Sequence, residues 1–179
     1  MKILFISDIH GVTNNLSYLH KLDIKEQFDK IVVLGDLYYS YSYRDDLDIN
    51  PQKVSEFLND LGTRIISLRG NCDSDYDMMV NTFPTTNGFI HFETDGINMY
   101  FAHGDNYSYR FRSKFNPEGV LIYGHEHIPY IKQEDGMTYV CVGSISVPRI
   151  GKPTYAIYQD KVITIYTIDN EIVDKIKLD

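Results

Sequence analysis

The chain of 179 residues has 17 Lys and Arg against 25 Asp and Glu, a formal net charge of −8, and is 43% hydrophobic. This composition is typical of a globular protein that buries a core, so we predict a single domain over residues 1–179. Proteins that hold nucleic acid present a basic face, so the acidic balance argues against a stable nucleic-acid partner. A small anionic substrate stays open, because bound metal can reverse the local charge.

The number of cysteines and the N-terminal residues indicate the cellular compartment. Cys72 and Cys141 lie far apart in the sequence, whereas secreted disulfide scaffolds carry more cysteines in a shorter chain. The apolar run from Ile3 to Ile6 is too short for a signal peptide, and no run approaches the length of a membrane span. We therefore expect a cytoplasmic protein that does not contact a membrane.

Buried strands and helices alternate in the first half of the chain. The expected elements are strands at 3–6, 31–34 and 65–68 and helices over about 14–25 and 51–61. Asn50 followed by Pro51 is a helix start, an N-cap residue before proline at the first helical position. Continuous apolar strands separated by helices indicate a parallel sheet that is covered on both faces.

The second half is richer in strands. Turn signals such as Asp95-Gly96 and Asp135-Gly136 separate short apolar stretches and predict hairpins. The expected strands are 89–93, 97–101, 120–123, 128–133, 138–142, 155–159 and 162–168. We predict an α/β fold in which two sheets stack with helices outside them.

Metal-capable side chains follow five of the apolar runs, each beside a glycine. The five strings are Asp8-Ile9-His10-Gly11, Gly35-Asp36, Gly70-Asn71, His103-Gly104 and Gly124-His125-Glu126-His127. In open α/β sheets ligands gather at the carboxyl ends of strands, so these five ends can converge on one crevice. Glycine allows close packing there. In extended backbone the alternate residues of Asp-x-His and His-x-His point the same way.

The converging side chains form a ligand set for two divalent ions: Asp8, His10, Asp36, Asn71, His103, His125 and His127. If Asp36 bridges the ions, each ion has four protein contacts and keeps positions for water and substrate oxygens. Four imidazoles disfavour Mg²⁺ and Ca²⁺, so we expect two transition-metal ions, Mn²⁺ first, with Fe, Zn²⁺, Ni²⁺ and Co²⁺ as alternatives. Two carboxylates leave the pair of ions with a positive excess that attracts phosphate.

The order Asp-x-His, Gly-Asp, Gly-Asn, His-Gly and Gly-His-x-His resembles that of the calcineurin-like metallophosphoesterase superfamily. The likeness runs from Asp8 to His127 and extends through residues 142–149. The Gly-Asn-Cys-Asp string is similar to that of the small bacterial and archaeal phosphodiesterases. The resemblance implies a four-layer α/β/β/α sandwich of two mixed sheets flanked by helices. It also implies one ion on Asp8, His10, Asp36 and His127, and a second on Asp36, Asn71, His103 and His125.

This resemblance implies a dinuclear phosphodiesterase that attacks small or nucleotide-like diesters with a metal-bridging hydroxide. Asn71 and His103 would help to hold the ester as charge develops. Many members have histidine after Gly-Asn, where this chain has Cys72. A thiol with a pKa near ~8.5 is less suited than imidazole to protonate a leaving group. We therefore expect stable leaving groups to be preferred, or a proton to come from Cys72, Asp73 or solvent.

Two rival functions stay open, because the motifs describe the metal centre and not the wall around the substrate. They are a phosphomonoesterase with the same site and a non-catalytic scaffold of the same fold. Two aromatic-rich segments, 37–50 and 105–118, can stack bases, but we favour a lid or a homo-oligomer contact. His20 and His91 are expected to be ordinary surface or boundary residues. For Arg69 and Arg149 the sequence leaves two roles open, contact with phosphate or a structural salt bridge.

Overall fold

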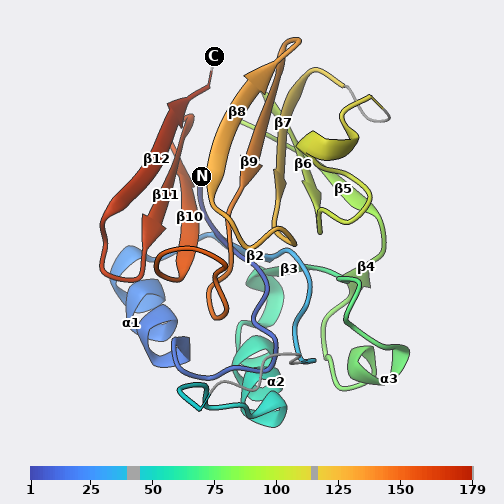
Figure 1. Cartoon of the computed structure of the whole chain (residues 1–179), viewed down its shortest axis with the longest axis vertical. Helices are drawn as coiled ribbons and strands as arrows, with labels where there is room; N and C mark the ends of the chain where they lie inside the picture. Colours follow the sequence, from blue (N-terminus) through green and yellow to red (C-terminus); the bar gives the residue numbers. More distant parts are fainter. Residues whose placement is uncertain (40–44, 114–116, 179) are drawn as a thin grey trace.

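The computed structural model describes residues 1–39, 45–113 and 117–178 of the chain. Within these residues the strands form two stacked sheets (Figure 1). The first sheet has the order β12-β11-β10-β1-β2-β3-β4. Its strands are β1 (Lys2–Ile6), β2 (Lys30–Val33), β3 (Ile65–Leu68), β4 (Thr85–Thr86), β10 (Thr154–Gln159), β11 (Val162–Thr167) and β12 (Ile172–Lys177). Strands β1 to β4 are parallel, and β10 to β12 join antiparallel, so this sheet is mixed.

The second sheet has the order β5-β6-β7-β9-β8. Its strands are β5 (Phe89–Thr94), β6 (Ile97–Ala102), β7 (Gly119–Tyr123), β8 (Tyr130–Glu134) and β9 (Met137–Cys141). The central pairs β6–β7 and β7–β9 are parallel, whereas the outer pairs are antiparallel hairpins. The predicted α/β class with two mixed sheets is confirmed.

Alternating side chains of the first sheet fill two separate cores. Val32 of β2 packs with Phe101 and other residues of the second sheet. Its neighbours Ile31 and Val33 point the opposite way and pack with residues of the helices, such as Leu58. Because successive strand residues face opposite sides, an unbroken apolar run is what a strand buried on both faces requires.

Helices cover the outer face of the first sheet. They are α1 (Leu16–Glu26) and α2 (Pro51–Asp60), with the one-turn η1 (Gly62–Arg64) after α2 and the short α3 (Asp75–Met78) after β3 (Figure 1). The side chain of Asn50 accepts a hydrogen bond from the Lys53 amide at 3.1 Å, so the predicted cap of α2 is confirmed. No helix in the described ranges is both long and apolar enough to cross a membrane.

The outer face of the second sheet has a thin cover made largely of aromatic side chains. Tyr107 and Tyr109 pack with Tyr139 on this face, and the helical element there among the described residues is the single turn η2 (Tyr109–Phe111). Tyr109 packs edge to face on Tyr139, with ring centroids 5.5 Å apart. Aromatic side chains thus take most of the place of the fourth layer.

Several element boundaries differ from the sequence predictions. The helix predicted from residue 14 begins at Leu16, because the Asn14 side chain is bonded to the backbone of Asp46 and Asp48 instead. The strand predicted over 128–133 starts only at Tyr130, after Pro129, which has no amide hydrogen for a sheet. The sequence also did not predict α3, β4 or β12.

Candidate metal centre

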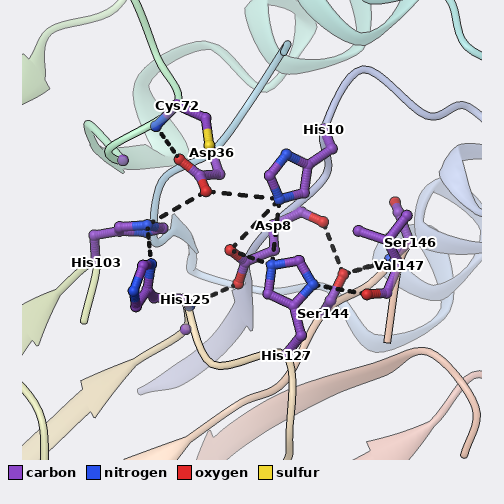
Figure 2. A network of polar contacts seen from close by, with 12 residues as sticks. Asp8, His10, Asp36, Cys72, His103, His125, His127, Ser144, Ser146 and Val147 are labelled. Atoms are coloured by element: carbon purple, nitrogen blue, oxygen red, sulfur yellow. Dashed lines mark hydrogen bonds and ion pairs between the residues drawn. The ribbon is translucent and has the colours of Figure 1, made fainter. Parts of the chain in front are cut away.

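The carboxyl ends of five strands bring the predicted ligands together. The five strings follow β1, β2, β3, β6 and β7. Figure 2 shows the side chains of Asp8, His10, Asp36, His103, His125 and His127 around one centre. His125 is half-buried and Asn71 is exposed, whereas the others are buried. The predicted convergence of strand ends is therefore what the structure shows.

The backbone reaches this centre through left-handed residues. Asp8 and His10 have φ values of +56° and +53°, and His125 and His127 have +62° and +57°. We expected extended backbone at these pairs, and that expectation is wrong. Residues with a Cβ rarely adopt positive φ, and such strained residues cluster at functional sites. Each pair reaches the centre by sharp turns after its strand has ended.

The first group of ligand atoms comes from Asp8, His10 and His127. Nε2 of His10 lies 3.3 Å from Nε2 of His127, and Nε2 of His127 lies 3.2 Å from Oδ1 of Asp8. In both rings Nδ1 lies 2.7 Å from a backbone carbonyl oxygen, that of Tyr39 or Val147. A carbonyl only accepts hydrogen bonds, so Nδ1 donates, and a neutral ring carries its lone pair on Nε2.

The second group comes from Asp36, His103 and His125. Nε2 of His103 lies 3.2 Å from Nδ1 of His125 and 2.9 Å from Oδ1 of Asn71. Nδ1 of His103 lies 2.8 Å from the carbonyl oxygen of Leu34, which orients this ring in the same way as those of the first group. The structure thus places the exposed Asn71 beside the second group.

Oxygen Oδ2 of Asp36 lies between the two groups. It is 3.6 Å from Nε2 of His10 in the first group and 3.4 Å from Nε2 of His103 in the second (Figure 2). A single carboxylate oxygen within reach of both groups is the geometry that a bridging ligand requires.

The donor atoms fit metal ions on three grounds. Oδ1 of Asp8 is buried and receives no hydrogen bond of good geometry from any described residue. The Nε2 lone pairs of His10 and His127 face each other at 3.3 Å, which is repulsive unless a cation or proton lies between them. Two nitrogens bound to one ion at about 2.1 Å are about 3.0–3.4 Å apart. The spacing found here is the spacing of two ligands on one ion.

In the second group, Asp36 and His103 shift each other's pKa. Burial acts to lower the pKa of His103, but the hydrogen bond to Asp36 and the charges of Asp8 and Asp36 together outweigh it, and the pKa rises to about 9. Burial acts to raise the pKa of Asp36, but His103 brings it well below its ordinary value. Burial also lowers the pKa of His10 and of His125. Asp36 therefore stays ionised, as a metal ligand must.

Glycines let the strand ends approach closely. A Cβ on Gly124 would collide with the Ser7 hydroxyl and with Oδ2 of Asp8, and a Cβ on Gly70 would collide with Oδ1 and the amide of Asp36. The same carboxylates accept backbone amides, Asp8 from His125 at 2.9 Å and Asp36 from Cys72 at 2.8 Å. The predicted role of glycine in close packing is confirmed at these two positions.

Asp73 lies beside the centre but is occupied by backbone amides. Its carboxylate accepts hydrogen bonds from the amides of Asp36 and Gly70 at 2.9 Å and of Leu37 at 2.7 Å. Burial, the largest influence, helps to raise its pKa to about 6. These three bonds favour a positioning role, and the proton-donor role that the sequence suggests stays a prediction.

Cys72 lies beside the ligand groups. Its thiol groups with His10 and Asp36, and burial followed by the charge of Asp36 raises its pKa to about 12. A thiol held in its protonated form can donate a hydrogen bond but does not attack as a nucleophile. Its part in catalysis stays a prediction.

Ser144 is a supporting residue that sequence reasoning did not assign. Its hydroxyl donates to the carbonyl oxygen of Asp8 at 2.8 Å and accepts from the amides of Ser146 and Val147 at 3.1 and 2.8 Å (Figure 2). Val147 in turn accepts from His127. The segment 142–149 entered the sequence analysis only through the family resemblance, since a buried serine carries no motif of its own.

The other residues considered from the sequence are not among the groups of candidate ligands. His20 and His91 are exposed, as expected. Arg69 bonds to the carbonyl oxygen of Asp73 and pairs with Asp75, which is the structural salt bridge. Arg149 is exposed.

The two aromatic-rich segments are described only in part. In the first, Tyr38 is buried and Tyr39 is exposed, while Tyr41, Tyr43 and Arg44 lie outside the described residues. In the second, Lys114 and Phe115 lie outside them. The described tyrosines Tyr107 and Tyr109 pack on the second sheet. Neither a lid nor a homo-oligomer contact is tested by these positions.

Comparison with known proteins places the chain among phosphoesterases. The profile of the calcineurin-like phosphoesterase superfamily domain matches residues 1–161. The phosphodiesterase YfcE of Escherichia coli (strain K12) is 30% identical over 176 residues, which is 97% of this chain and 95% of the relative. The solved structure of YfcE, described as a phosphoesterase from E. coli, matches with a TM-score of 0.90 at 29% identity and covers 100% of both chains. Vps29 of Entamoeba histolytica, solved with Zn²⁺, shares the fold with a TM-score of 0.64 at 15% identity, covering 98% of each chain.

Proposed function

The chain belongs to the calcineurin-like phosphoesterase superfamily, and from this premise we propose that it hydrolyses small or nucleotide-like phosphodiesters at a centre of two divalent metal ions. It is a metal-dependent phosphoester hydrolase by its family. The observation that carries the proposal is the position of Asp36, whose Oδ2 lies within 3.6 Å of His10 and 3.4 Å of His103. One oxygen shared by two ligand groups supports two ions.

Each ion would have its own group of ligands. One would be held by Asp8, His10, Asp36 and His127, and the other by Asp36, Asn71, His103 and His125. Ions bound there would supply Lewis-acid polarisation of the phosphoryl oxygens and a water of lowered pKa. Imidazole-rich ligand groups favour transition metals, and we propose Mn²⁺ first, with Fe, Zn²⁺, Ni²⁺ and Co²⁺ as alternatives.

The protein groups prepare the site before substrate binds. Hydrogen bonds from His103 to Leu34 and from His127 to Val147 fix the ring orientations, so ligand geometry costs little reorganisation on binding. Asn71 is exposed next to His103 and is therefore placed to contact the ester. We propose Asn71 and His103 as the residues that orient the ester, and Cys72 as a hydrogen-bond donor near the leaving group.

The acidic chain supports a small substrate. With a net charge of −8 the surface is unsuited to a long nucleic acid, whose binding relies on basic groups. We propose a small-molecule phosphoester as the substrate and the cytoplasm as the place of action, because two well-separated cysteines do not form a secreted disulfide scaffold. Self-association is a separate hypothesis, and the molecular mass of the protein in solution tests it.

Hydrolysis of two chromogenic esters tests the proposal. Protein stripped of metal is assayed on bis-p-nitrophenyl phosphate and on p-nitrophenyl phosphate, with Mn²⁺, Ni²⁺, Zn²⁺ or Mg²⁺ added back. We expect Mn²⁺ to restore cleavage with a preference for the diester. Asp36→Asn should lose at least about 100-fold in turnover, since it removes the shared ligand, while the exposed control Asp60→Asn should match the wild type.

Other results would change the assignment. A preference for the monoester would make the protein a phosphatase with the same centre. No turnover of either ester with any of the four metals would favour the non-catalytic scaffold. Normal activity of Asp36→Asn would contradict the shared ligand.

A further inference from the structure

A hollow of about 290 Å³ lies directly beside the candidate metal centre. It is enclosed by three separate segments: the turn after β3, the connection from β4 to β5, and the loop after β6. The lining side chains that matter are those of Arg69, Asn71, Asn87, Asp105, Asn106 and Tyr107. We call this the Asn71 hollow.

The Asn71 hollow is continuous with the place where the ester would be held. Asn71 lines it, and Oδ1 of Asn71 lies 2.9 Å from Nε2 of His103, in the second ligand group. The phosphate of a phosphodiester is esterified with two alcohols, and both remain attached when the phosphate lies at the ligand groups. One of them would therefore extend past Asn71 into the hollow.

The charges around the hollow disfavour a second phosphate. The guanidinium of Arg69 is committed, because Nε donates to the carbonyl oxygen of Asp73 at 2.8 Å and Nη1 pairs with Asp75. Asp105 adds a carboxylate to the lining. A negatively charged group would meet two acids, Asp73 and Asp105, and no uncommitted cation among the described lining residues, so the occupant is uncharged.

The remaining lining groups suit a polar molecule that contains a ring. Asn87 and Asn106 are exposed, and each carboxamide has donor and acceptor groups. Nδ2 of Asn106 donates one hydrogen bond to Asp105 at 2.7 Å, which leaves its second hydrogen and its oxygen for a ligand. The ring of Tyr107 packs edge to face against Phe89, with centroids 5.3 Å apart, so its position is fixed. An aromatic side chain of this kind can stack a base or a sugar face. Amides beside a fixed tyrosine match the groups of a nucleoside.

A second hollow of about 410 Å³ between α2 and α3 is the rival position. It is lined by Tyr38, Pro51, Gln52 and Tyr76 among others, and its lining is mostly apolar. None of the described residues that line it is a candidate metal ligand. An ester held at the centre would therefore extend into the Asn71 hollow in preference to this one.

We propose that the Asn71 hollow binds one alcohol group of the diester, that this group is a nucleoside, and that Asn87 and Asn106 select it. The inference rests on the proposed function, because it places the phosphate at the two ligand groups. It adds the residues that decide which diester is cleaved.

A comparison of two diesters with the same leaving group tests the proposal. The p-nitrophenyl ester of thymidine monophosphate is compared with methyl p-nitrophenyl phosphate, and the readout is the ratio of their kcat/KM values in the Mn²⁺-loaded protein. We expect the wild type to favour the thymidine ester. Asn87→Ala and Asn106→Ala should each lower that ratio about three- to tenfold, through the lost hydrogen bonds.

Gln52→Ala is the matched control, since it removes an amide from the rival hollow. It should leave the ratio as in the wild type, and circular dichroism confirms that all three variants are folded. If only Gln52→Ala lowers the ratio, the nucleoside lies between α2 and α3. If no variant changes it while both esters are cleaved, the Asn71 hollow does not select the substrate.

A binding measurement separates this proposal from the proposed function. Thymidine binding is followed by saturation-transfer NMR on the wild type and on Asn106→Ala, without any need for turnover. Binding that weakens at least threefold in Asn106→Ala supports the hollow even if neither ester is cleaved, in which case the proposed function alone fails. Absence of thymidine binding to the wild type overturns the hollow.

Discussion

Three of the imidazoles are fixed in the same way. Nδ1 of His10, His103 and His127 each donates to a backbone carbonyl oxygen, at 2.7, 2.8 and 2.7 Å. This directs Nε2 of each ring at the ligand groups, and in a neutral ring that nitrogen carries the lone pair. The orientation of these three rings therefore comes from hydrogen bonds to the backbone, which no motif in the sequence displays.

Asp73→Asn tests positioning against proton donation. The carboxylate accepts three backbone amides, whereas a carboxamide would turn its NH₂ toward at least one of them. We expect a loss of about 1–3 kcal/mol in the free energy of unfolding and an equal fall in turnover for p-nitrophenyl and alkyl leaving groups. Urea unfolding and the two kcat values provide the measurements.

Asp77→Asn is the control for this substitution. Asp77 also accepts a backbone amide, that of Ser74, but in an exposed capping box of α3. It should leave both kcat values near those of the wild type. If Asp73→Asn slows only the alkyl leaving group, which needs a proton, Asp73 is the proton donor and the positioning role is wrong.

The identity of the ligands was predictable, but their local conformation was not. Asp8, Asp36 and His103 were found because metal-capable residues follow buried strands at a common edge. The positive φ of Asp8 and Asp36 could not be predicted, since residues with a Cβ avoid that region unless the surrounding fold holds them there. Only the tertiary contacts supply that constraint.

At the scale of elements, the strand ends approach so closely that a residue with a side chain does not fit at Gly124. Gly124→Ala would set a Cβ against the Ser7 hydroxyl and Asp8. Because both neighbours are buried and the Asp8 carboxylate is held by the His125 amide, we expect at least about 2 kcal/mol of destabilisation and weaker Mn²⁺ binding. Thermal unfolding and isothermal titration with Mn²⁺ measure the two effects.

Gly96→Ala is the matched control, in the turn between β5 and β6. Nothing lies within 4 Å of its Cβ position, but φ is +75°. We expect Gly96→Ala to lower the free energy of unfolding by about 1 kcal/mol through backbone strain and to leave Mn²⁺ binding unchanged. Equal effects of the two substitutions on Mn²⁺ binding would show that the approach at Gly124 does not shape the centre.

The elements that were not predicted are short or weakly buried. Strand β4 has two residues and α3 has four, which is below the length at which periodicity carries a signal. Strand β12 exposes Ile172 and Val173, so its pattern lacks a buried face. Its position is set by antiparallel pairing with its neighbour β11 and by a contact distant in sequence, the Ile131 amide, which donates to Asp174 at 3.0 Å.

At the scale of the molecule, the two sheets share one core that holds the strand ends in register. Phe101 of β6 packs edge to face on Phe5 of β1, with centroids 5.3 Å apart. We expect Phe101→Ala to lower the free energy of unfolding by about 3–5 kcal/mol. The melting temperature should fall by about 2–4 °C per kcal/mol.

Ile172→Ala is the control, because Ile172 is 59% exposed on β12. It should change stability by less than about 0.5 kcal/mol. Circular dichroism in urea gives both values. A Phe101→Ala effect as small as that of Ile172→Ala would mean that the sheets do not depend on this contact.

Electron paramagnetic resonance during titration with Mn²⁺ tests the central claim most directly, because it reports whether two ions share a ligand. With Asp36 as the shared ligand the ions would lie about 3.5–4 Å apart. We predict two Mn²⁺ per chain and the multiline spectrum of a coupled pair, and in Asp36→Asn the loss of that coupling. One Mn²⁺ per chain with an uncoupled six-line spectrum in the wild type would contradict a dinuclear centre.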